Sequence, residues 1–140
     1  MKQFRKFSSA SVFVVSMMAV LWLVGCAAKG APEKTNCDAS IKWEVVDEAK
    51  LIQFECALGK HEGYPSLIFT VGLENPTDKP LRYRLIIFLD DMDKANGHLV
   101  PRTGKPPVIE PGKSQTVKIP FMGTDKFSKK ILVVVRTIEL

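Results

Sequence analysis

The sequence has few of the residues on which catalysis usually depends. It contains only two histidines, His61 and His98, and no Gly-x-Ser-x-Gly segment. Nucleophilic and general acid–base catalysis need a nucleophile beside a base, or two positioned carboxylates. Both histidines are expected beside loops, as solvated side chains. We therefore expect a protein that is not an enzyme and that holds no cofactor.

A strong excess of one charge is also missing. The formal net charge is +5, but three basic residues fall in the leader described below, and the rest of the chain carries +2. Domains that bind nucleic acids are usually far more basic. With 140 residues, 46% of them hydrophobic, the composition is that of a single globular domain. We therefore expect no nucleic-acid partner.

Residues 1–25 have the pattern of a signal peptide. A basic start is followed by the apolar run 10–24, which is too short to span a membrane alone. The segment Leu-Val-Gly-Cys at 23–26 resembles the lipobox of bacterial lipoproteins. The resemblance implies cleavage before Cys26 and acylation of its thiol and its new amine. A plain signal peptide and an uncleaved anchor are the alternatives.

A lipid on Cys26 would make the membrane the first partner of this protein. Two or three acyl chains hold a protein stably where one chain does not. Ala27 favours the outer membrane, because Asp at that position resembles the inner-membrane retention signal of enteric bacteria. The small and polar residues of 26–36 predict a tether, and 37–140 is left as the folded domain.

Two cysteines remain once Cys26 is acylated. Cys37 and Cys56 would lie in an oxidising compartment, where an even number of cysteines favours a disulfide. The break at 47–49 predicts a hairpin that brings the two residues close together. Free thiols are one alternative, and a metal site that adds His61 is another, although its spacing matches no zinc motif.

The pattern of the domain is that of strands. Apolar residues alternate with polar ones at period two, and Phe69 and Leu85 are expected on the inner faces. The run 131–138 is apolar on both faces and therefore central, whereas Pro120 indicates an edge strand or a bulge. Loops or turns are expected at 59–65 and 90–97, and one helical turn at 124–127. We predict an antiparallel, immunoglobulin-like β-sandwich of six to seven strands.

The order of turns from Asn75 onward resembles that of YcfL-like bacterial lipoproteins and, more loosely, FxLYD-type immunoglobulin-like domains. The landmarks are Asn75, Pro80, Tyr83-Arg84 leading an apolar strand to Asp90, a turn at Gly97, and Ile109-Glu110-Pro111-Gly112 before another strand. The resemblance covers roughly residues 70 to 140 together with the lipobox. It implies an envelope lipoprotein with an all-β domain and no established chemistry.

Two segments have some of the residues of ligand-binding loops. Gly112-Lys113-Ser114 matches the end of a phosphate loop, but Pro107 occupies the position of the first glycine and a strand, not a helix, follows. Asp90, Asp91, Asp93 and Asn96 could supply oxygen ligands to calcium, but their spacing departs from that of an EF-hand. Turn residues account for both segments, because Asp, Asn and Gly suit turn dihedrals.

Two surfaces are candidates for binding. Ile86 and Phe88 are large apolar residues on the face of their strand that also carries Arg82 and Arg84, so either the excursion 91–107 or a partner protein should cover them. The first function we expect is therefore a lipid-anchored accessory or assembly factor that binds another envelope protein. The second is a module for an anionic ligand such as lipopolysaccharide, peptidoglycan or anionic lipid. Its proposed basic patch is formed by Lys105, Lys113, Lys118, Lys126, Lys129 and Lys130.

Overall fold

The structure, a computed structural model, describes residues 28–140. The predicted signal peptide, its cleavage site and the lipid site at Cys26 lie outside the described residues. Within 28–140 the regular structure is entirely β. The strands are β1 (Lys34–Thr35), β2 (Ser40–Val45), β3 (Lys50–His61), β4 (Tyr64–Glu74), β5 (Arg82–Leu89), β6 (Lys94–Val100), β7 (Ser114–Met122) and β8 (Lys130–Ile138).

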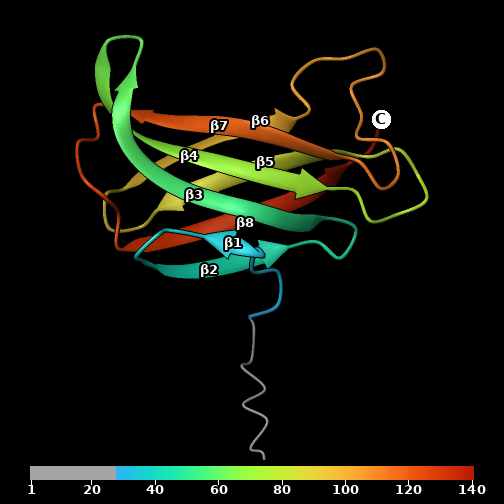
Figure 1. Ribbon diagram of the computed structural model, residues 1–140, viewed down its shortest axis with the longest axis horizontal. Coiled ribbons are helices and arrows are strands. Elements are labelled where there is room, and N and C mark those ends of the chain that lie inside the picture. Colours follow the sequence, from blue (N-terminus) through green and yellow to red (C-terminus); the bar gives the residue numbers. More distant parts are fainter. Residues whose placement is uncertain (1–27) are drawn as a thin grey trace, which may run out of the picture.

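The eight strands form two sheets of four, which lie face to face as a sandwich (Figure 1). One sheet has the order β1-β3-β4-β7, and the other has the order β2-β8-β5-β6. The all-β sandwich expected from the sequence is confirmed. Both sheets are mixed rather than purely antiparallel, because β1 runs parallel to β3 and β2 runs parallel to β8. The additional strand beyond the expected six to seven reflects β1, which has only two residues.

The core lies between the sheets, where the inward residues of each strand meet. Phe69 and Leu85 are both fully buried, as the alternation predicts. An aromatic series, Trp43, Phe54, Phe69 and Phe121, links neighbouring rings at centroid distances of 5.1 to 5.5 Å. The expected central position of β8 and edge position of β7 are also confirmed. Pro120 is tolerated in β7 because an edge strand has backbone positions without a ladder partner.

The predicted hairpin at 47–49 is wrong. β2 and β3 belong to different sheets, so this turn carries the chain across the sandwich instead of pairing the two strands. Alternation reveals which face of a strand is buried, but it does not reveal which neighbour the strand pairs with. Tyr83 holds the crossing in place, because its buried hydroxyl donates a hydrogen bond of 2.6 Å to the carbonyl oxygen of Glu48. Burial, together with the charge of Glu48, raises the pKa of Tyr83 to about 12.

Three predicted loops also differ from the structure. The segment 59–65 belongs to a long β3–β4 hairpin whose turn is Glu62-Gly63, and both residues have positive φ, 50° and 82°. This two-residue turn suits the twist of the flanking strands. The predicted turn at 90–97 is shorter, because β6 already begins at Lys94. The predicted helical turn at 124–127 is irregular, and it buries Thr124.

Candidate functional surfaces

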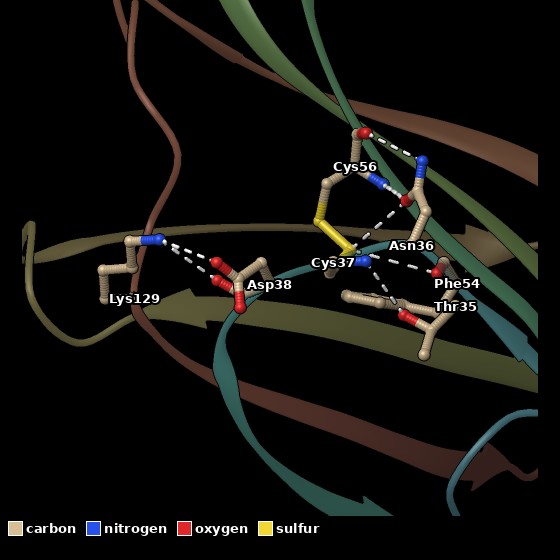
Figure 2. The surroundings of a disulfide bond; sticks show 7 residues. All are labelled: Thr35, Asn36, Cys37, Asp38, Phe54, Cys56 and Lys129. Carbon is tan, nitrogen blue, oxygen red and sulfur yellow. Dashed lines mark hydrogen bonds and ion pairs between the residues drawn. A yellow bond between two sulfur atoms is a disulfide. The ribbon is translucent and has the colours of Figure 1, made fainter.

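The predicted disulfide between Cys37 and Cys56 is present, with 5.2 Å between the Cα atoms (Figure 2). It lies where β1 leaves β3. The parallel ladder pairs Lys34 with Gln53 and Thr35 with Phe54, an offset of 19 residues, and Cys37 and Cys56 have the same offset. The disulfide therefore continues the register of the ladder, and its geometry follows from a parallel pair rather than from the expected hairpin. Both sulfurs are bonded to each other, so the thiolate ligands of the alternative metal site are absent.

Asn36 supports the same junction through its side chain. Its amide oxygen accepts a hydrogen bond of 2.7 Å from the backbone N–H of Cys56, and its amide nitrogen donates one of 3.3 Å to the Cys56 carbonyl oxygen (Figure 2). The side chain thus takes the place of a backbone partner just where β1 ends. The chain between the two sheets is therefore fixed at this point by one covalent bond and two hydrogen bonds.

The predicted tether is packed against the domain from its first described residues. Gly30 has φ +86°, and a Cβ built there would lie 3.1 Å from the side chain of Val45 on β2. The ammonium group of Lys29 lies 3.0 Å from the carboxylate of Asp47, and Lys50 pairs with Glu33. Gly30 is half-buried by these contacts. Part of the predicted tether therefore lies against the domain, since Gly30 contacts β2 and Lys34–Thr35 form β1.

The outer face of the β2-β8-β5-β6 sheet carries the predicted partner surface. Strand register places Ile86 beside Val134, and Phe88 beside Leu132, in two adjacent rows. All four side chains are half-buried although no other element of the described chain packs on this face as a layer. We name these four residues the apolar rows: Ile86, Phe88, Leu132 and Val134.

The apolar rows are bounded by charged side chains and by a shallow hollow. Lys42 and Glu44 of β2 continue the two rows on one side. Arg84 and Arg136 form the next row along the strands, and Arg136 lies 3.4 Å from Glu44. On the β6 side the surface dips into a hollow lined by residues of β5 and β6, namely Arg84, Ile86, Ala95, Gly97 and Leu99.

The excursion 91–107 does not cover Ile86 and Phe88. It returns as β6, which pairs with β5 edge to edge, so Gly97 lies opposite Ile86 and Ala95 opposite Phe88. The expectation of a covering loop is therefore wrong. A Cβ on Gly97 would overlap the carbonyl oxygen of Leu85, which explains why the smallest residue stands there and why the surface is hollow beside Ile86.

The opposite side of β6 joins the two sheets through polar side chains. The amide of Asn96 donates a hydrogen bond of 2.7 Å to the carbonyl oxygen of Pro120 on β7, and the ammonium group of Lys94 donates one of 2.8 Å to the hydroxyl of Thr124. His98 occupies the next inward position, and burial together with the charge of Arg102 lowers its pKa. These residues close the free edge of β7, so they are structural in this fold.

The six lysines of the predicted basic patch are all exposed, but the fold does not bring them together. Lys113 precedes β7 and Lys126 follows it, so the length of that strand, roughly 25 Å, separates them. Lys118 projects from the middle of the same strand, and Lys105 lies in the loop before it. Lys129 and Lys130 lie beside each other at the start of β8, and Lys129 is 3.3 Å from the carboxylate of Asp38.

The oxygen-rich turn after β5 has a structural use. The carboxylate of Asp91 accepts hydrogen bonds from the hydroxyl of Ser128 and from the backbone N–H of Lys129. These two bonds, the Ser128 bond first, lower the pKa of Asp91. Within residues 28–140, no three side chains of His, Cys, Asp or Glu gather in a way that would hold a metal ion.

Sequence reasoning missed two features. Asn75 is fully buried: its side chain donates hydrogen bonds to the carbonyl oxygens of Lys79 and Ile109 and accepts two from Thr77. The segment Asn75-Pro76-Thr77 predicts the turn, but it does not predict the hydrogen bonds of the buried Asn75 side chain. The second feature is a pair of exposed apolar side chains: Tyr64 at the start of β4 is 61% exposed, and Met122 at the end of the neighbouring strand β7 is 50% exposed. Because a loop is expected at 59–65, an exposed Tyr64 there does not stand out in the sequence.

Comparison with protein-family models, with curated proteins and with solved structures finds no match for this chain. The resemblance to YcfL-like lipoproteins therefore stays a prediction. Residues 28–140 contain no helix with the length and apolar character needed to cross a membrane.

Proposed function

We propose that this protein is a lipid-anchored, non-enzymatic domain that binds another protein of the cell envelope through the outer face of the β2-β8-β5-β6 sheet. The apolar rows carry this proposal, because they leave Ile86 and Phe88 half-buried on an open face with no covering layer. Contiguous apolar surface bounded by polar residues is typical of interaction sites. The lipobox at 23–26 supports attachment to the periplasmic side of a membrane, with the outer membrane favoured.

The arrangement around the rows is that of a protein interface. Such interfaces have an apolar centre and a polar rim. Here two rows of apolar side chains form the centre, and Arg84, Arg136, Lys42 and Glu44 form the rim. The hollow beside Ile86 offers a place for a side chain of the partner. The alternative, an anionic-ligand site made of six lysines, receives less support because Lys113 and Lys126 flank β7 at opposite ends, while Lys130 begins β8 in the other sheet.

The proposal is tested with the double variant Ile86→Ser and Phe88→Ser. Cross-linking in cells followed by purification should recover an envelope protein with the wild type and lose it with the variant. The variant should stay folded, because both side chains are only half-buried. The matched control is Ile68→Ser, another half-buried apolar residue, on the outer face of the opposite sheet. Equal recovery by all three proteins would reject this face as the binding surface.

Thermal melts decide whether a loss of capture is specific. If the double variant melts far below the wild type, Ile86 and Phe88 stabilise the domain itself, since burying each is worth about 1.5–3 kcal/mol. A normal melt together with lost capture is the result that the proposal requires.

A further inference from the structure

The N-terminal side of the sandwich is only a few residues away from the predicted lipid site at Cys26. In both sheets the N-terminal strand is at one edge: β1 begins one sheet order and β2 begins the other. In Figure 1 these strands form the lower edge of the molecule, and the first described residues lie below them. At the opposite edge are β6 and β7.

Little chain is left between this edge and Cys26. Gly30 packs on Val45, and the N–H of Ala31 donates a hydrogen bond of 2.9 Å to the carbonyl oxygen of Ala28. Lys29 pairs with Asp47. From Cys26 to Ala28 there are two peptide steps, which span at most about 7.6 Å between Cα atoms. An acylated Cys26 would therefore leave at most about 7.6 Å between its Cα atom and that of Ala28, the first described residue below the β1/β2 edge.

We infer that the β1/β2 edge rests on the bilayer surface, so that the two sheets stand on edge and the apolar rows face sideways, along the membrane. The inference rests on the acylation of Cys26 that is part of the proposed function. Strands in a sheet are about 4.8 Å apart, and β5 is two strands from β2. Ile86 and Phe88 would then lie roughly 10 Å above the edge, which suits a partner attached to the same membrane.

The charges of this edge indicate that the anchor, not electrostatic attraction, sets the orientation. Apart from His61 with Glu62, every ion pair among residues 28–140 includes a residue between 29 and 50. Lys29, Lys42 and Lys50 each have a carboxylate partner there. A polybasic lipid-binding surface would instead leave its lysines free for anionic headgroups.

Trp43 is a natural reporter for this orientation. The sequence has two tryptophans, Trp22 and Trp43, and cleavage before Cys26 leaves Trp43 alone. Trp43 lies on β2, the strand that would be nearest the bilayer, and it is half-buried. A far-edge reporter is obtained with Trp43→Phe, which keeps an aromatic ring against Phe54, combined with Leu99→Trp on β6.

The experiment uses the mature acylated protein in phosphatidylcholine vesicles that contain a lipid with a nitroxide on its headgroup, a short-range quencher of tryptophan fluorescence. We expect strong quenching of Trp43 and little quenching of the Leu99→Trp reporter. Insertion of ten Gly and Ser residues after Ala27 should relieve the quenching of Trp43 while flotation with vesicles is kept. Replacing part of the phosphatidylcholine by phosphatidylglycerol should change none of these results.

Five outcomes would overturn the inference. Equal quenching of both reporters in floating protein would mean that the domain has no fixed orientation. Quenching that the ten-residue insertion leaves unchanged, or that appears only with phosphatidylglycerol, would mean that surface charge and not the short anchor holds the edge down. If the protein does not float with the vesicles, it has no lipid anchor, and both the proposed function and the inference are wrong. If it floats but Trp43 is not quenched, only the inference is wrong.

Discussion

Cys37 and Cys56 are joined two residues beyond the last pair of the β1–β3 ladder, in the register that the ladder sets. Lys34 and Thr35 pair with residues 19 positions later, and the disulfide spans the same 19 positions. The bond therefore fixes a two-residue parallel strand that has few other contacts with its sheet. It also fixes the point from which the chain crosses to β2.

Removing this disulfide should destabilise the domain. The chain-entropy model gives roughly 3 kcal/mol for a loop of about 20 residues. We expect the double variant Cys37→Ser and Cys56→Ser to show a lower urea midpoint than the wild type, and the wild type to move to the same value when reductant is added. Cys26→Ser should leave the midpoint where it is. Two reactive thiols in protein purified from the periplasm without reductant would contradict the bond.

Two of the glycines inside strands, Gly97 and Gly59, should respond differently to alanine. A Cβ on Gly97 would overlap the Leu85 carbonyl oxygen, whereas a Cβ on Gly59 would meet only the end of the Ile68 side chain at 3.5 Å. Overpacking of this kind typically costs 1–3 kcal/mol. Thermal unfolding should therefore show a clear loss for Gly97→Ala and a small change for Gly59→Ala. Similar melting temperatures for the two variants would mean that β5 and β6 are not as close as described.

Asn75 should be among the most sensitive polar residues of the domain. Asn75→Ala removes four hydrogen bonds and leaves the buried carbonyl oxygen of Ile109 without this partner. The Ile109 oxygen keeps its bond from the Leu81 N–H, so the cost is that of four lost hydrogen bonds at about 0.5–1.5 kcal/mol each, and the free energy of unfolding should fall by at least about 2 kcal/mol. Asp78→Ala, at an exposed position of the same turn, is the control. Equal urea midpoints for the two variants would show that the network contributes nothing.

Asp91 should contribute to acid sensitivity. The Ser128 hydroxyl and the Lys129 N–H lower its pKa in the folded state below the usual 3.8. The unfolded chain therefore binds this proton first, and the stabilisation is full above about pH 4 and lost as the pH falls through the lowered value. Asp91→Asn and Ser128→Ala should both flatten the loss of stability below about pH 4, measured by urea unfolding across pH. If the free energy of unfolding of both variants falls below about pH 4 as steeply as that of the wild type, Asp91 does not have this role.

The parts of the fold that the sequence predicts are those set by local pattern. Period-two alternation identified the strands and the inward positions of Phe69 and Leu85, because burial on one face of a strand imposes that pattern. The pairing of β2 with β8 across 90 residues leaves no local pattern, so the sequence predicts a hairpin with the next strand instead. The two residues of β1 are too few to show any alternation.

β6 shows why a strand with polar inward side chains is not predicted from hydrophobic alternation. Its inward side chains, Lys94, Asn96 and His98, bond to or pack near the free edge of β7, so the side that faces the other sheet is polar. The sequence therefore resembled a turn. The candidate surface was found for the opposite reason. Ile86 and Phe88 are apolar where an open face should be polar, and this contrast is visible from the sequence alone.

The most direct test of the account is photo-cross-linking in living cells from a photoreactive phenylalanine placed at Phe88, in the full-length chain. We expect an adduct with an envelope protein that disappears with Cys26→Ser and that is not formed from Thr70, on the outer face of the opposite sheet. An adduct of the same size from Thr70, or one that persists unchanged with Cys26→Ser, would contradict a lipid-anchored domain that binds its partner through the apolar rows.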